Sequence, residues 1–136
     1  MKLRATLSSG FRAPTPGQGN ISNISTVSGN DGVLFQKGTL APTNPVSMQY
    51  GGKVLSPEES TNTSFGVVWD ATDALTITLD AYEIELTDRI TQGDDVTLTA
   101  SDIANLTAQG IPGAADLTNF RFYVNDFDTT TKGIDL

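Results

Sequence analysis

The sequence predicts an all-β fold, an antiparallel up-and-down meander of about four strands with two long loops and one short helix in a loop. Three observations lead to this fold class. Apolar and polar residues alternate with a period of two in several short runs. The chain holds 13 Gly and 6 Pro, which favour turns and loops. One connection between the alternating runs is short, whereas two others are long and polar.

The clearest element is a β-hairpin with a short turn at residues 71–74. Every second residue of its two strands is apolar near the turn. Because side chains alternate between the faces of a strand, the apolar residues of both strands should share one face. These apolar residues are Phe65, Val67, Trp69, Leu75, Ile77 and Leu79, and the opposite face should carry Thr76, Thr78 and Asp80.

The second hairpin strand changes its pattern at residues 81–82. From there on the apolar set is Tyr82, Ile84 and Leu86, and the polar positions are Glu83 and Glu85. Two explanations fit this change of parity. Either a β-bulge inserts one residue, or the strand leaves one environment for another.

Two further strands flank the hairpin. An early strand covers residues 3–8 and ends before Pro14, which cannot donate a hydrogen bond to a sheet. A last strand starts near Phe120.

The two long connections span residues 15–56 and 92–118. The first is rich in Gly and Pro and indicates at most a short hairpin near residues 33–35. The second contains a helical pattern at residues 101–110, with Ser101 or Asp102 as the expected N-cap and Gly110 at the C-terminal end. In an antiparallel meander both long connections should lie at the same end of the sheet, opposite the short turn.

Short turns at one end and long loops at the other are typical of transmembrane β-barrels. The two hairpin strands, at residues 60–70 and 75–89, both reach the roughly 9–11 residues that a tilted strand needs to cross a bilayer. A soluble β-sandwich would show the same alternation. The two folds differ in what the apolar face meets, which is lipid in a barrel and a protein core in a sandwich.

Composition excludes several classes of function. The formal net charge of −8 argues against a nucleic-acid partner, because binding to phosphates needs a basic surface. The chain has no Cys and no His, which removes disulfides, thiolate and imidazole metal sites and Ser-His-Asp triads.

Four sequence motifs, in order along the chain, resemble motifs of TonB-dependent outer-membrane receptors. Residues 10–15 (GFRAPT) resemble the end of an outward-going strand, and residues 55–60 (LSPEES) the start of the next inward-going strand. Residues 82–90 (YEIELTDRI) are similar to the family's following outward strand. The last motif, at residues 120–136, resembles an inward strand of the family. It contains Asn125 and, further along, Gly133-Ile134-Asp135.

The resemblance implies that residues 1–136 are a partial β-barrel domain, about four strands of a larger transmembrane barrel. It implies energy-coupled uptake of a nutrient such as a siderophore, haem, cobalamin or a carbohydrate, and no enzymatic activity. The outer membrane of a Gram-negative bacterium is then the expected location. No plug domain and no TonB box are matched, so the TonB complex would act through parts outside this stretch. The alternative is a soluble extracellular β-sandwich of adhesin or carbohydrate-binding type.

Six residues of these sequence motifs are the candidate structural residues. They are Arg12, Pro14, Pro57, Glu58, Asn125 and Gly133. Arg12 and Glu58 should lie at the outer ends of neighbouring strands, where an ion pair would fix the first long loop. Aromatic and sulfur-containing residues of that loop, namely Phe35, Met48 and Tyr50, are the candidates for ligand contact.

No catalytic residue, cofactor or metal site is expected. Asp94 and Asp95, with Asp88 nearby, offer carboxylates for calcium, but their spacing fits no EF-hand and indicates a solvated acidic loop. Glu83 and Glu85 lie on one strand face, where a glycosidase pair is conceivable, but they are expected to face water. The expected partners are a small nutrient molecule and membrane lipid. The isolated chain should either pair with another copy or curl so that a loop covers its apolar face.

Overall fold

The computed structural model describes residues 1–29, 32–115 and 117–136. The described residues form two four-stranded sheets and three short helices, divided between two compact units. The elements are β1 (Lys2–Arg12), α1 (Pro16–Asn20), β2 (Asn23–Ser28), β3 (Leu34–Thr39), α2 (Pro45–Gln49), β4 (Glu58–Thr72), β5 (Leu75–Gln92), β6 (Val96–Thr97), α3 (Ala100–Ala108), β7 (Leu117–Arg121) and β8 (Tyr123–Asp135).

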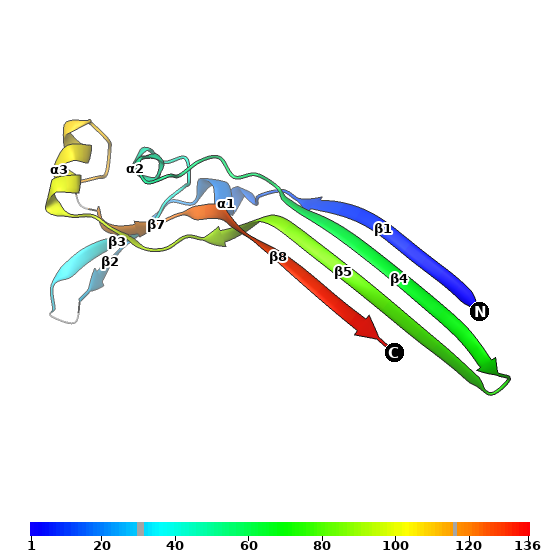
Figure 1. Cartoon of the computed structure of the whole chain (residues 1–136). Helices are drawn as coiled ribbons and strands as arrows, with labels where there is room; N and C mark the ends of the chain where they lie inside the picture. Colours follow the sequence, from blue (N-terminus) through cyan, green and yellow to red (C-terminus); the bar gives the residue numbers. More distant parts are fainter. Residues whose placement is uncertain (30–31, 116) are drawn as a thin grey trace. The chain divides into compact units, whose positions relative to one another are not determined.

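The first unit, called the sheet unit below, is built on the sheet with strand order β1-β4-β5-β8. It comprises Met1–Ala13, Pro57–Arg89 and Phe127–Leu136. Figure 1 shows these strands side by side, in the order that a meander requires. β4 is antiparallel to both β1 and β5. The sheet is open, with β1 and β8 at its edges. The all-β antiparallel prediction is therefore confirmed.

The hairpin of β4 and β5 has the predicted faces. Val67 is directly opposite Leu79, and Trp69 is opposite Ile77. Directly paired residues of an antiparallel sheet project to the same side, so the apolar residues of both strands share one face. The turn is shorter than predicted, because β4 continues to Thr72 and leaves only residues 73–74 outside the strands.

The change of parity at residues 81–82 has no bulge behind it. The pairing of β4 with β5 runs without a shift from Glu59↔Thr87 to Asp70↔Thr76. A bulge would have moved every later pair by one residue, so that explanation is wrong. Alternate residues of β5 therefore stay on the same two faces throughout, and only the polarity of the residues on each face changes along the strand.

The second unit, called the loop unit below, comprises Pro14–Ser56 and Ile90–Asp126. It corresponds to the two long connections. They fold into a second sheet of order β2-β3-β7-β6, in which β3 from the first connection runs parallel to β7 from the second. The expectation of two long loops with one short helix therefore understated the structure in this region. Among the described residues this unit also contains all three helices.

The apolar core of the described residues lies within the loop unit. Phe120 and Ala114 are fully buried, and Leu117 is nearly so. Both connections supply core residues, so each one covers apolar surface of the other. The cluster contains Leu40, Val46, Leu98, Leu106, Ala114, Leu117, Phe120 and Phe122.

Local hydrogen bonds explain where α3 begins and ends. Thr99, not Ser101 or Asp102, is the N-cap, and its hydroxyl accepts from the Asp102 amide at 3.2 Å. The Asp102 carboxylate accepts in return from the Thr99 amide at 2.8 Å, which completes a capping box. Gly110 has a φ of 72° and ends the helix as predicted, since glycine adopts this left-handed conformation at little cost.

Both long connections leave the same end of the sheet unit. The first runs from Arg12 to Glu58, which are paired with each other, and the second begins after the part of β5 that pairs with Glu59. The short turn of the hairpin closes the opposite end. This arrangement is the predicted one. None of the described helices is long and apolar enough to span a bilayer.

Candidate functional site

The sheet unit has two chemically different faces, which follow from its register. The Trp69 face, named after its single tryptophan, is apolar over the rows nearest the short turn. Its side chains there are Leu3, Ala5, Phe65, Val67, Trp69, Leu75, Ile77, Leu79 and Ala81. Phe65 is 52% exposed and Trp69 53%, so neither side chain is buried in a core of the described residues. The soluble sandwich would require these side chains to be buried against a second sheet.

The opposite face, named the Arg4 face, is mainly polar over the same rows, with Val68 as its apolar member. Arg4 on β1, Gly66 on β4 and Asp80 on β5 lie in one row. The Arg4 guanidinium is ion-paired with the Asp80 carboxylate and donates two hydrogen bonds to it. The pair passes over Gly66, where any Cβ would overlap both side chains. Thr76 adds a hydrogen bond of 3.0 Å from its hydroxyl to Asp70 nearer the turn.

The predicted partners Arg12 and Glu58 are joined where β1 ends and β4 begins. They are directly opposite in the register, and Arg12 Nη2 donates to Glu58 Oε1 at 2.7 Å. The Glu58 side chain is only 8% exposed, whereas that of Arg12 is 64% exposed. The ion pair thus joins the two strand ends between which the first long connection departs.

A second motif residue acts at the root of the loop unit. The Asn125 side chain accepts from the Ser56 amide at 2.8 Å and donates to the Ser56 carbonyl at 3.0 Å. A side-chain amide that bonds to both the N–H and the C=O of one residue makes the same two hydrogen bonds as the backbone of a neighbouring strand. It ties the last residue of one half of the loop unit to the second half.

Gly133 lies beneath an aromatic ring. A Cβ at this position would overlap the Tyr82 side chain, so the ring of β5 rests directly on the backbone of β8. Lys132, its neighbour, is ion-paired with Glu83 at 2.7 Å. Of the other motif residues, Pro57 is exposed, and Pro14 borders a shallow hollow of the loop unit.

The three residues expected to contact ligand are not brought together into one hollow. Phe35 borders a largely apolar depression with Val33, Thr97 and Asn119. Met48 is 58% exposed at the end of α2. Tyr50 packs edge-on against Phe120, with ring centroids 5.5 Å apart. Burial raises the pKa of Tyr50, and the negative charge of Asp102 adds to this.

Two of the carboxylates considered for metal binding or catalysis, those of Asp95 and Glu83, form ion pairs with lysines. Asp95 forms an ion pair with Lys37 at 2.5 Å. Asp88 has a φ of 53°, and its amide donates to the Asp128 carboxylate at 3.0 Å. Nearby, the Arg89 guanidinium lies 5.0 Å from the centre of the Phe127 ring, within range of a cation–π interaction.

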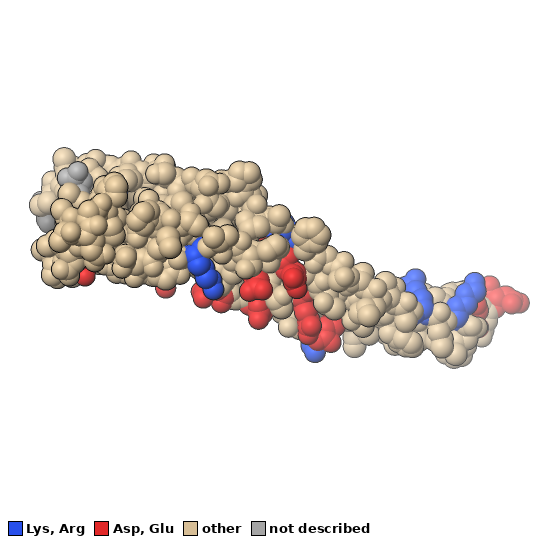
Figure 2. All heavy atoms as spheres, turned by 90° about the horizontal axis from the view of Figure 1, so that it is seen from above, with Lys and Arg blue, Asp and Glu red and all other residues tan. Residues whose placement is uncertain are grey.

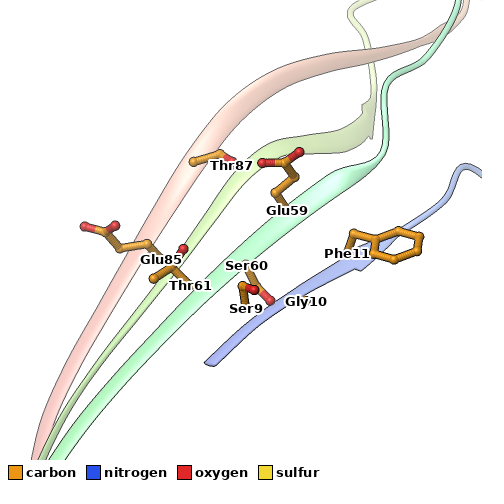
Figure 3. A pocket seen from close by; sticks show the side chains of 8 residues that line it. All are labelled: Ser9, Gly10, Phe11, Glu59, Ser60, Thr61, Glu85 and Thr87. Atoms are coloured by element: carbon orange, nitrogen blue, oxygen red, sulfur yellow. The ribbon is translucent and has the colours of Figure 1, made fainter. Parts of the chain in front are cut away.

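In its rows farthest from the turn, the Trp69 face is polar instead of apolar. A hollow of about 330 Å³ crosses β1, β4 and β5 there and is lined mainly by hydroxyls and by the carboxylates of Glu59 and Glu85. In Figure 3 these two carboxylates rise from neighbouring strands, with Thr61 and Thr87 beside them. Figure 2 shows acidic side chains gathered over one stretch of the strands, with few charges on much of the rest of that surface.

Sequence reasoning missed two features of the site. The Arg4–Asp80 pair was not foreseen, although Gly66 in a strand interior is a signal of close approach. The contact of Tyr82 with Gly133 was not foreseen either, because it joins residues far apart in the sequence.

The comparisons with known proteins point to one family. Searches of curated proteins and of solved structures gave no match. The family model described as TonB dependent receptor-like, beta-barrel, matches residues 1–136, which is the whole of the sequence. This is a family of outer-membrane receptors and transporters of Gram-negative bacteria and not of enzymes. The chain therefore belongs to the TonB-dependent receptor β-barrel family.

Proposed function

We propose that the chain forms part of the barrel wall and of the extracellular vestibule of an outer-membrane receptor for energy-coupled nutrient uptake. The observation that carries this proposal is the pair of contrasting faces of the sheet unit. A sheet with an uncovered apolar face and an ion-paired, hydroxyl-rich opposite face suits a barrel wall between lipid and an aqueous interior.

The loop unit would form the extracellular part. Both of its halves leave the end of the sheet opposite the short turn, as extracellular loops do in such barrels. The shared core and the parallel pairing of β3 with β7 support a folded surface that is formed before ligand arrives. In this proposal the ion pair of Arg12 with Glu58 and the Asn125–Ser56 hydrogen bonds hold the root of this surface.

Ligand contact is proposed for Phe35 and Met48, which expose apolar surface in the first connection. Tyr50 has a structural contact with Phe120 instead. In the receptor, Phe35→Ala and Met48→Ala should lower ligand affinity while leaving the amount of folded protein unchanged. Equal affinity of both variants and wild type would rule out these two contacts.

The topology can be tested by labelling intact cells. The sequence has no cysteine, so single cysteines can be placed at Gln49 and Ala104 in the loop unit and at Asp73 in the short turn. A maleimide that cannot cross membranes should label the two loop-unit positions on intact cells. It should label Asp73→Cys only after the outer membrane is permeabilised. Labelling of Asp73→Cys on intact cells would contradict the proposal.

A further inference from the structure

On the Trp69 face, the side chains of β4 and β5 change from apolar to polar at one level, and β5 changes from polar to apolar on the opposite face at the same level. On the Trp69 face, the row of Phe65 and Ala81 is apolar, the next contains Thr63 and Glu83, and the one after it Thr61 and Glu85. On the Arg4 face, the Arg4–Asp80 row is followed by rows in which β5 contributes Tyr82, Ile84 and Leu86, whereas β1 and β4 contribute only polar or small residues there. The register is continuous through these rows, so the reversal is a property of the sequence along a regular strand.

A reversal that two neighbouring strands share on the Trp69 face indicates that the surroundings of this face change at this level. A wall that leaves hydrocarbon for water exchanges apolar outward side chains for polar ones. Charged side chains are costly in hydrocarbon, and the carboxylates of Glu59, Glu83 and Glu85 all follow the last continuous apolar row of β4 and β5. Leu7, in the row of Thr63 and Glu83, and Phe11 are the large apolar residues that depart from this pattern, and both lie on the edge strand β1.

The ion pair of Lys132 with Glu83 marks the transition on neighbouring strands. Its two side chains meet at 2.7 Å, with the Lys132 side chain 68% exposed. Ile134 and Leu136 follow on β8 and beyond its end at the same parity as Lys132, and both are largely exposed. The apolar band on β8 thus begins just past the residue that pairs with Glu83.

The dimensions agree with a membrane-spanning band that ends here. Thr63 and Thr72 on β4 are nine residues apart. At a rise of about 3.4 Å per residue and a tilt of about 40°, this stretch covers a height of about 23 Å. The apolar band of outer-membrane barrels is about 25 Å tall.

We infer that the outer surface of the membrane crosses this sheet at the row of Thr63 and Glu83, with Lys132 and Glu83 among the lipid headgroups. This inference rests on the proposed function and adds whether each row of the sheet contacts acyl chains, lipid headgroups or water. The rows nearer the turn contact acyl chains. The rows of Thr61–Glu85 and Glu59–Thr87, including the hollow of Figure 3, stand above the acyl chains in water.

The inference can be tested by depth measurements on the receptor reconstituted in phosphatidylcholine vesicles. Single cysteines at Leu79, Glu85 and Thr87 on the Trp69 face carry an environment-sensitive fluorophore, with Thr78→Cys as the control on the opposite face. The Leu79 label should emit at short wavelength and be quenched by nitroxides on the acyl chains. The Glu85 and Thr87 labels should resist that quencher and be quenched by iodide in the water.

The outcomes separate this inference from the proposed function. If the labels at Glu85 and Thr87 are quenched by acyl-chain nitroxides as strongly as the label at Leu79, the boundary is placed wrongly although the lipid-facing wall stands. If the label at Leu79 is instead quenched only by iodide, the lipid-facing wall itself fails, and the boundary with it. Two reporters above the boundary keep the test decisive if one cysteine variant does not fold.

Discussion

Arg4 on β1 is ion-paired with Asp80 on β5, although β4 lies between these two strands. The pair is formed because the residue between them is Gly66, whose missing side chain leaves room over the middle strand. The relationship links three strands through one polar contact on the face proposed to line the barrel interior.

Replacing Gly66 should therefore disrupt all three strands at once. A Gly66→Val side chain would overlap Arg4 and Asp80, and overpacking of this kind costs about 1–3 kcal/mol. The unfolding temperature of the receptor should fall, measured by the loss of its folded band on electrophoresis after heating. Ser64→Val on the same face of β4 is the control, and equal effects of both variants would contradict this role of Gly66.

The contact of Tyr82 with Gly133 predicts a non-additive pair of substitutions. Gly133→Ala should destabilise the sheet, because the new methyl group overlaps the Tyr82 ring. In a Tyr82→Ala background the same change should cost much less, since the ring is gone. A double-mutant cycle on unfolding free energies measures this coupling. Additive effects would show that the ring and the glycine do not interact in solution.

The core of the loop unit predicts a large effect from one aromatic residue. Phe120 is fully buried and contacts the rings of Tyr50 and Phe122. Phe120→Ala should cost about 3–5 kcal/mol, because it leaves a cavity between the two connections. Proteases should then cleave within residues 15–56 and 90–126. Phe11→Ala is the matched control, since Phe11 is 79% exposed, and comparable cleavage of both variants would contradict the shared core.

The capping box of α3 predicts a dependence on pH. Hydrogen bonds from the Thr99 hydroxyl and amide lower the pKa of Asp102 from its ordinary value of 3.8. A lowered folded-state pKa stabilises the helix above the ordinary pKa, and this contribution is lost as the pH falls through the folded-state value.

Hydrogen exchange can measure this contribution. Compared with wild type at the same pH, Asp102→Asn should expose the amides of α3 more often at about pH 6. The two proteins should become more alike as the pH falls through the folded-state pKa of Asp102, because the carboxylate charge is then lost in the folded state as well. A difference between variant and wild type that stays the same as the pH falls would exclude the carboxylate charge as the cause.

Local patterns were enough to predict the hairpin and its faces. The alternation near Trp69 and Ile77 spans neighbouring residues, so the faces follow from the period of a strand. The ion pair of Arg12 with Glu58 could be predicted because both residues belong to sequence motifs that mark strand ends. The N-cap of α3 was misplaced, because Thr99, Ser101 and Asp102 all suit a cap and only the backbone geometry selects Thr99.

The loop unit could not be predicted because its order depends on distant residues. Gln36 of β3 pairs with Leu117 of β7, and β6 has only two residues, too few for any period to show. Core residues such as Leu40 and Ala114 lie in short stretches with Gly, Pro and Ala that show no strand or helix period, and only the pairing of the two connections buries them. The Arg4–Asp80 pair likewise depends on a register that spans three strands.

The open sheet predicts the behaviour of the isolated 136 residues. β1 and β8 are edge strands, and the Trp69 face leaves large side chains such as Phe65 exposed. Free edges and exposed apolar patches favour association between copies. Light scattering coupled to size-exclusion chromatography in a mild detergent-free buffer should show more than one copy per particle. A strictly monomeric particle with Trp69 shielded from quenchers would instead favour a soluble fold.

In the proposed barrel wall, the Trp69 face meets lipid and the Arg4 face does not. The most direct measurement places single nitroxide labels at positions 75–80 of β5 in the membrane-embedded receptor and records their collisions with oxygen and with a water-soluble nickel complex. The labels at Leu75, Ile77 and Leu79 should collide mainly with oxygen, which concentrates in lipid, and those at Thr76, Thr78 and Asp80 should collide much less with it. Equal oxygen accessibility at neighbouring positions, or the opposite alternation, would contradict the account.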